Sequence, residues 1–136
     1  MINLAFGWVW ITMGFLSGAM LGMGFHREQF MGGYDSWARR LTRLGHIAFF
    51  GTGFLNVLLG LTLLALGDQA SSITWNIAQG GLVVGAFAMP ICCLIAAWNK
   101  KVKLIFVIPV VALTLGGVLV NYELVRLYLS TMGGAS

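Results

Sequence analysis

Charged residues are scarce in this sequence of 136 residues: they make up 9% of it, against 59% hydrophobic residues. A water-soluble domain of this size needs more polar side chains than that to cover its surface. We therefore expect lipid to be the solvent for most of the chain. Apolar runs cover residues 3–25, 45–66, 73–98 and 102–129, and each reaches the roughly 20 residues that cross the hydrocarbon layer of a membrane.

Groups that perform catalysis are also few. Only four residues are acidic, none of them in the first apolar run, and we expect no buried carboxylate of the kind that couples transport to protons. A Ser/His/Asp arrangement and a glycine-rich phosphate loop are both missing, which argues against hydrolases and kinases. The two cysteines, Cys92 and Cys93, are neighbours in the third run, where a disulfide between them would be strained. We expect both to be reduced packing residues.

The basic residues that are present have an informative placement. Seven of the eight lie in two short gaps between apolar runs, which is the positive-inside pattern of membrane proteins. We expect both gaps to be cytoplasmic, with both termini and the gap at residues 67–72 on the other side, and the size and charge bias favour a bacterial inner membrane. Because these cations set the topology and meet anionic lipid, we do not expect nucleic-acid binding. They are Arg27, Arg39, Arg40 and Arg43 in the first gap and Lys100, Lys101 and Lys103 in the third.

The predicted fold is an all-α integral membrane protein, a single domain over residues 1–136. Because the gaps are short, successive helices are expected to be antiparallel neighbours in an up-down bundle of four transmembrane helices. Residues 36–44 place three apolar side chains on one helical face, and they predict a short amphipathic interfacial helix between helices 1 and 2. Asp35 or Ser36 can cap the start of that helix. The three apolar side chains are those of Trp37, Leu41 and Leu44.

Two further residue types bear on the arrangement. Four aromatic residues fall near the expected outer interface and Trp98 near the inner one, where amphipathic rings are common. Pro90 lies inside the third run and predicts a kink, because proline removes one backbone donor from a helix. The four outer aromatic residues are Trp8, Trp10, Trp75 and Tyr122.

The two histidines are the residues most able to carry chemistry. His26 lies at the cytoplasmic end of the first run and His46 near the cytoplasmic start of the second, so an antiparallel pair would hold them at similar depth. Glycines occur every four residues before His26 and every seven residues after His46, so each histidine has glycines on its own side of the helix. A helix face of glycines allows either close contact with another helix or room for a flat ring. A histidine at its end can supply an axial nitrogen to haem iron. The glycines are Gly14, Gly18 and Gly22 before His26, and Gly53 and Gly60 after His46.

We therefore expect a b-type haem or a quinone between helices 1 and 2, with His26, His46, Gly22 and Gly53 as the cofactor-binding residues. His26 and His46 would ligate the haem iron. The predicted function is that of a small integral-membrane subunit of a larger respiratory or electron-transfer complex, not catalytic on its own. Its partners would be other integral-membrane subunits and membrane lipid. A purely structural anchor and a small oligomeric transporter or channel are the alternatives.

Overall fold

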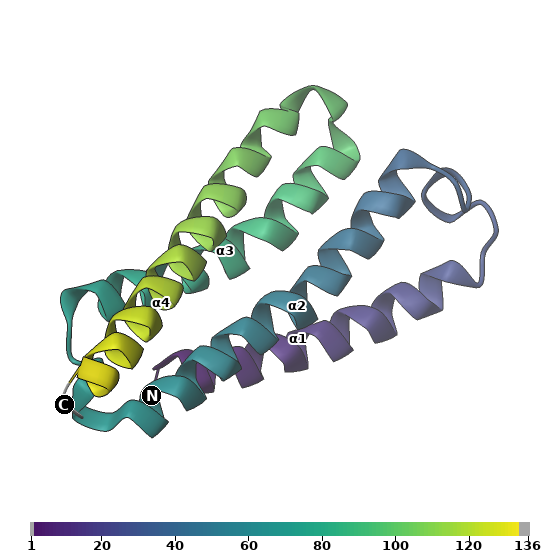
Figure 1. The fold of residues 1–136 in the computed structure, drawn as a ribbon. Helices are drawn as coiled ribbons and strands as arrows, with labels where there is room; N and C mark the ends of the chain where they lie inside the picture. The colour runs from purple at the N-terminus through teal and green to yellow at the C-terminus, as the bar shows by residue number, and fades with distance from the viewer. Residues whose placement is uncertain (1, 134–136) are drawn as a thin grey trace.

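The regular elements of this chain are all helices in the computed structural model, which describes residues 2–133 (Figure 1). The four α-helices are α1 (Ile2–Phe25), α2 (Trp37–Leu66), α3 (Ile73–Trp98) and α4 (Val107–Gly133). Short 3-10 helices occupy the three connections: η1 (Phe30–Gly32), η2 (Gly67–Ala70) and η3 (Lys100–Phe106). Each of the four long helices is long and apolar enough to cross a membrane, as the four apolar runs predict.

Helix α2 begins eight residues earlier than the apolar run that predicts it. The Ser36 side chain accepts a hydrogen bond from the Arg39 backbone N–H at 3.2 Å and caps the helix. No residue between this cap and Gly45 stops a helix, and Gly45 itself packs closely on α3, where a Cβ atom would lie 3.1 Å from Cβ of Cys93. The expected interfacial helix is therefore not a separate element; its residues form the first turns of α2.

Helix α4 begins later than expected, because Pro109 lies near its start. Proline has no N–H and its ring clashes with the carbonyl four residues before it, so it is tolerated only in the first turn of an α-helix. The preceding segment, Lys100–Phe106, accordingly forms a 3-10 helix. The Cys92 thiol donates a 3.4 Å hydrogen bond to the carbonyl of Ile105 in that segment. Both cysteines are buried free thiols, as predicted.

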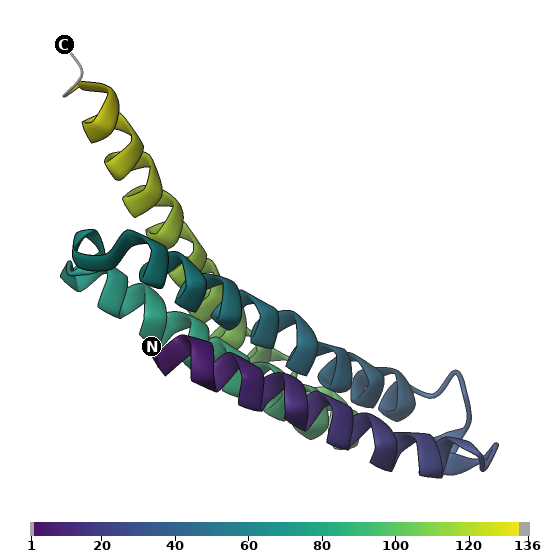
Figure 2. The same cartoon turned by 90° about the horizontal axis from the view of Figure 1, so that it is seen from below.

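Successive helices are antiparallel, as in the predicted up-down bundle, and α4 lies at one edge of the array. Helices α1, α2 and α3 pack together, whereas α4 packs along α3 and has no extended contact with α1. Figure 2 shows the C-terminal end of α4 diverging from the other three helices. Much of the apolar surface of α4 is therefore not covered by the rest of the chain.

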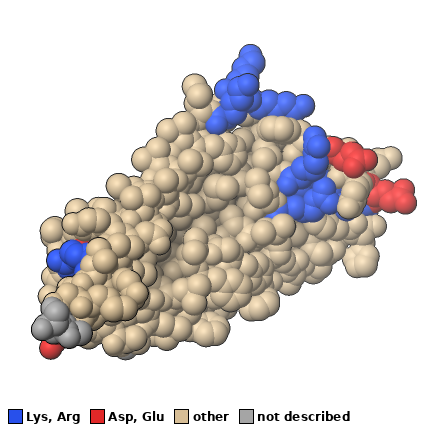
Figure 3. Space-filling model, in the orientation of Figure 1, with Lys and Arg blue, Asp and Glu red and all other residues tan. Residues whose placement is uncertain are grey.

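The basic residues gather at one end of the molecule. Figure 3 shows Lys and Arg side chains concentrated at the end that carries the α1–α2 and α3–α4 connections, with a lone basic group near the opposite end. The start of α1, the end of α4 and the α2–α3 connection are all directed to that opposite end (Figure 1), although the end of α4 diverges from the other two (Figure 2). Because successive helices are antiparallel, the first and third connections lie at one end of the molecule and the second connection at the other.

Two of the tryptophans expected near the outer interface are buried within the chain. Trp10 is 8% exposed and contacts the rings of Phe6, Phe49 and Phe87, so that it joins α1, α2 and α3. Trp75 has no exposed surface. Trp8, Tyr122 and Trp98 remain exposed, as expected of interfacial aromatics.

A buried amide pair also connects the first three helices. The Asn3 amide donates hydrogen bonds to Oδ1 of Asn56 at 2.7 Å and to the Gln79 carbonyl at 3.2 Å. The Asn56 amide in turn donates to the carbonyls of Thr52 and Leu82. Each such bond across transmembrane helices contributes about 0.6–2 kcal/mol. These amides fix α1 against α2 and α3 at the end opposite the basic loops.

Candidate functional site

Glycine contacts between α1 and α2 set the register that positions the histidines. A Cβ atom on Gly60 would lie 2.6 Å from the Leu4 backbone nitrogen, and one on Gly53 would lie 2.8 Å from a side-chain carbon of Ile11. The same antiparallel register places Gly18 opposite His46, because a Cβ atom on Gly18 would lie 2.7 Å from Cε1 of the imidazole. The two helices therefore touch along most of their length.

This register does not bring His26 and His46 together. His26 lies eight residues beyond Gly18, which at about 1.5 Å per residue is about 12 Å further along the helix. It is exposed and follows the last residue of α1. The register places it near Ala38 of α2, so one haem iron between the two imidazoles is not supported within a single chain.

His46 instead has a defined partner on α1. Its Nδ1 lies 2.9 Å from the hydroxyl oxygen of Ser17, and that hydroxyl donates a 2.9 Å hydrogen bond to the Gly14 carbonyl. The Phe50 ring stands nearly perpendicular to the imidazole, with 5.3 Å between ring centroids. No hydrogen-bond partner of Nε2 is found among residues 2–133. The half-buried imidazole is thus held at one nitrogen and free at the other.

The two glycines predicted to bind a cofactor have contrasting environments. Gly53 is buried against Ile11 and the Gly7 carbonyl, so no slot for a flat ring exists there. A Cβ atom on Gly22 would meet nothing within 4 Å, which leaves its backbone on an open face. The space that Gly18 provides is filled by the His46 ring itself. A slot between bare helix backbones is therefore not the role of these glycines.

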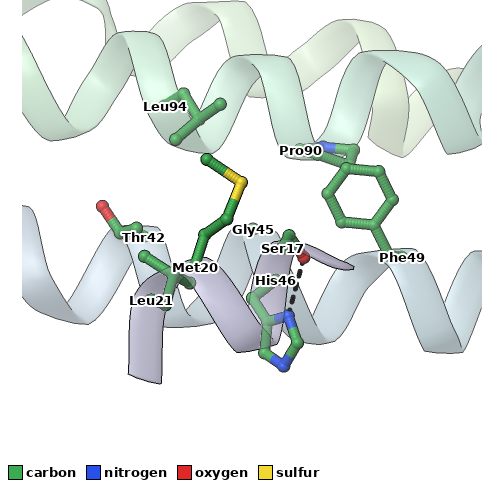
Figure 4. A pocket seen from close by; sticks show the side chains of 9 residues that line it. All are labelled: Ser17, Met20, Leu21, Thr42, Gly45, His46, Phe49, Pro90 and Leu94. Carbon is green, nitrogen blue, oxygen red and sulfur yellow. Dashed lines mark hydrogen bonds between the residues drawn. The ribbon is translucent and has the colours of Figure 1, made fainter. Parts of the chain in front are cut away.

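A cavity lies on the side of His46 that faces α3. It has a volume of about 150 Å³ and an apolar lining, and Met20 extends across it toward Leu94 (Figure 4). The imidazole points away from Pro90 and Leu94, and its Nε2 is directed to the far side from α3. The lining residues are Ser17, Met20, Leu21, Thr42, Gly45, His46, Phe49, Pro90 and Leu94.

A haem would extend well beyond this apolar space of about 150 Å³. An apolar cavity of about 150 Å³ accommodates a benzene-sized ring, which is much smaller than a haem macrocycle. Its lining also offers no free polar group to a quinone carbonyl, because the Thr42 hydroxyl already donates to the Ala38 carbonyl. A haem or quinone that uses His46 must therefore approach from the side of α1 and α2 that is turned away from α3, where Nε2 is free. We call this side the outer face of the α1–α2 pair.

Arg39 is a structural residue that the charge pattern alone presents as one of several surface cations. It is 6% exposed, and its guanidinium lies 4.4 Å from the centroid of the Phe25 ring. It donates hydrogen bonds to the carbonyls of Phe25 and Glu28. A cation at the carbonyl end of a helix is favourable, so Arg39 fastens the end of α1 to the start of α2.

Glu123 is an acidic residue of α4 that is buried against the start of α3. It is 1% exposed, accepts a 2.7 Å hydrogen bond from the Ser72 hydroxyl, and forms a 2.7 Å ion pair with Arg126. The spacing of Glu123 and Arg126 predicts their pairing, whereas the contact with Ser72 depends on the tertiary fold. Both carboxylate oxygens are engaged, so the group anchors α4 to the start of α3.

No protein-family model, curated protein or solved structure matches the chain. Among residues 2–133, no group of three or more His, Cys, Asp or Glu side chains is placed to hold a metal ion. His46 with its Ser17 partner is therefore the best-defined candidate site.

Proposed function

We propose that this chain is a small integral-membrane subunit of an electron-transfer assembly, in which His46 presents its free nitrogen to a redox cofactor. The cofactor is a b-type haem or a quinone shared with other membrane subunits at the outer face of the α1–α2 pair. The proposal places the chain in a bacterial inner membrane, with the two basic loops cytoplasmic. It revises the expected ligand pair, because His26 takes no part.

The observation that carries the proposal is the half-buried His46 imidazole, fixed by Ser17 on one side and free on the other. An ionisable side chain among apolar helices is a functional candidate because it is costly to keep there. Metal-ligating histidines characteristically use one ring nitrogen for the metal and the other for a hydrogen bond that orients the ring. The His46 contacts match that division of roles.

The uncovered apolar surface of α4 supports assembly with other subunits. Only a small part of this helix is buried within the chain, although its length and apolarity equal those of its neighbours. Lipid or partner helices must cover it. A structural anchor without a cofactor would need the same surface, so the cofactor is what distinguishes the two functions.

The absorption spectrum of the purified protein tests the proposal. We expect a Soret band that persists in the His26→Ala variant and falls at least about tenfold in His46→Ala, because loss of an axial ligand exceeds the 10- to 100-fold effect of losing an outer partner. Organic extraction of the same samples identifies a bound quinone. A colourless, quinone-free wild-type protein that copurifies with larger subunits would support the structural anchor instead. Equal loss of the band in both variants would restore the bis-histidine arrangement.

A further inference from the structure

The contacts of the Ser17 hydroxyl bear on which nitrogen of His46 carries the proton. A serine hydroxyl has one hydrogen to donate and two lone pairs with which to accept. The hydroxyl oxygen lies 2.9 Å from Nδ1 of His46, and the O–H group donates a hydrogen bond to the Gly14 carbonyl, also at 2.9 Å. With its one hydrogen directed at Gly14, Ser17 can only accept from Nδ1. In that arrangement the neutral imidazole carries its proton on Nδ1.

The opposite tautomer satisfies fewer groups. With a lone pair on Nδ1, the Ser17 hydrogen would turn to the imidazole and its bond to Gly14 would be lost. Nε2–H would then be a donor with no hydrogen-bond partner among residues 2–133. The Nδ1–H tautomer allows two hydrogen bonds, one from Nδ1–H to Ser17 and one from Ser17 to the Gly14 carbonyl. The Nε2–H tautomer allows only the bond between Ser17 and Nδ1.

We infer that Ser17 is a positioning residue that holds His46 in the Nδ1–H form, so that Nε2 presents an electron pair to the outer face of α1 and α2. This inference rests on the proposed function and narrows its cofactor. An electron pair ligates haem iron, whereas a quinone carbonyl is itself an acceptor and needs a donor. The site therefore takes a haem, and not a quinone bound through its carbonyl.

Nitrogen NMR of the cofactor-free protein tests the tautomer directly. In the His26→Ala variant with ¹⁵N-histidine, His46 is the only histidine, and the shifts of protonated and unprotonated ring nitrogens are well separated. At a pH where the ring is neutral, we expect Nδ1 protonated and Nε2 unprotonated. Ser17→Ala should produce a mixture of tautomers, and Ser17→Thr, which keeps a hydroxyl able to bond the preceding turn, should retain the wild-type pattern. A predominant Nε2–H form, or no change in Ser17→Ala, would overturn the inference.

Titration with hemin and with a short-chain quinone analogue separates this inference from the proposed function. We expect hemin to bind with the spectrum of an imidazole-ligated iron, about tenfold more weakly in Ser17→Ala, and the quinone not to bind. Hemin binding that is unchanged in Ser17→Ala would overturn the positioning role while leaving His46 as the ligand. Binding of the quinone but not of hemin would overturn the narrowing to haem. An Nδ1–H tautomer in a protein that binds neither probe, even when it is purified together with its partner subunits, would retain the role of Ser17 and refute the proposed function.

Discussion

Replacing Gly60 by alanine is expected to lower the free energy of unfolding in detergent by about 1–3 kcal/mol, the usual effect of overpacking a tight contact. The new Cβ atom would lie 2.6 Å from the backbone nitrogen of Leu4 and 2.8 Å from its Cα. Backbone atoms cannot move aside as the end of a flexible side chain can, so α1 and α2 must separate. Thermal or denaturant-induced unfolding, followed by circular dichroism, measures the loss.

Gly51→Ala is the matched control for this substitution. Gly51 lies in the same helix, and a Cβ atom there would meet nothing within 4 Å. Alanine favours an α-helix over glycine by about 1 kcal/mol, so the control should be as stable as the wild type or more so. A similar loss in Gly51→Ala and Gly60→Ala would contradict the close packing of α1 on α2.

Trp75→Ala is expected to have the largest effect on stability, a loss of about 3–5 kcal/mol. The ring has no exposed surface and packs with Leu59 and Leu82 in the cluster that connects α2 and α3. In lipid or detergent this loss comes mainly from the packing contacts that the cavity removes, since the surrounding solvent is also apolar. Unfolding with sodium dodecyl sulfate as the denaturant measures it.

Trp98→Ala provides the comparison at the other end of α3. That ring is 84% exposed, so its removal should change stability by no more than about 0.5 kcal/mol. A large loss in Trp98→Ala with little change in Trp75→Ala would mean that the burial of the two tryptophans has been assigned the wrong way round.

The sequence predicts the number and type of helices well, because apolar runs of membrane-spanning length leave few alternatives. It misplaces the starts of α2 and α4 for local reasons. Gly45 looks like a boundary, yet it lies inside α2 because α3 packs against it. Pro109 looks like one more residue of an apolar run, yet it delays α4 until Val107. Hydropathy contains no information about the contact of Gly45 with α3 or about the N–H group that Pro109 lacks.

The candidate site is only half predictable for a related reason. The sequence singles out His46, but its partner Ser17 follows from the register of α1 against α2, which glycine contacts decide. Gly18, Gly22 and Gly53 look alike in the sequence, but the structure gives each a different neighbour. Gly18 faces the imidazole of His46, Gly22 faces open space, and Gly53 faces the side chain of Ile11. The spacing of the glycines from each histidine does not show which of them contacts the neighbouring helix.

Disulfide trapping of the α1–α2 register tests this account most directly. In a Cys92→Ala/Cys93→Ala background, the pair Gly14→Cys and Phe49→Cys should oxidise readily, because a Cβ atom on Gly14 would lie 3.2 Å from that of Phe49, close to disulfide geometry. Gly22→Cys with Phe49→Cys should not, although a register that levels His26 with His46 would bring this second pair together. Efficient trapping of the Gly22 pair and failure of the Gly14 pair would contradict the placement of His46 against Ser17 and Gly18.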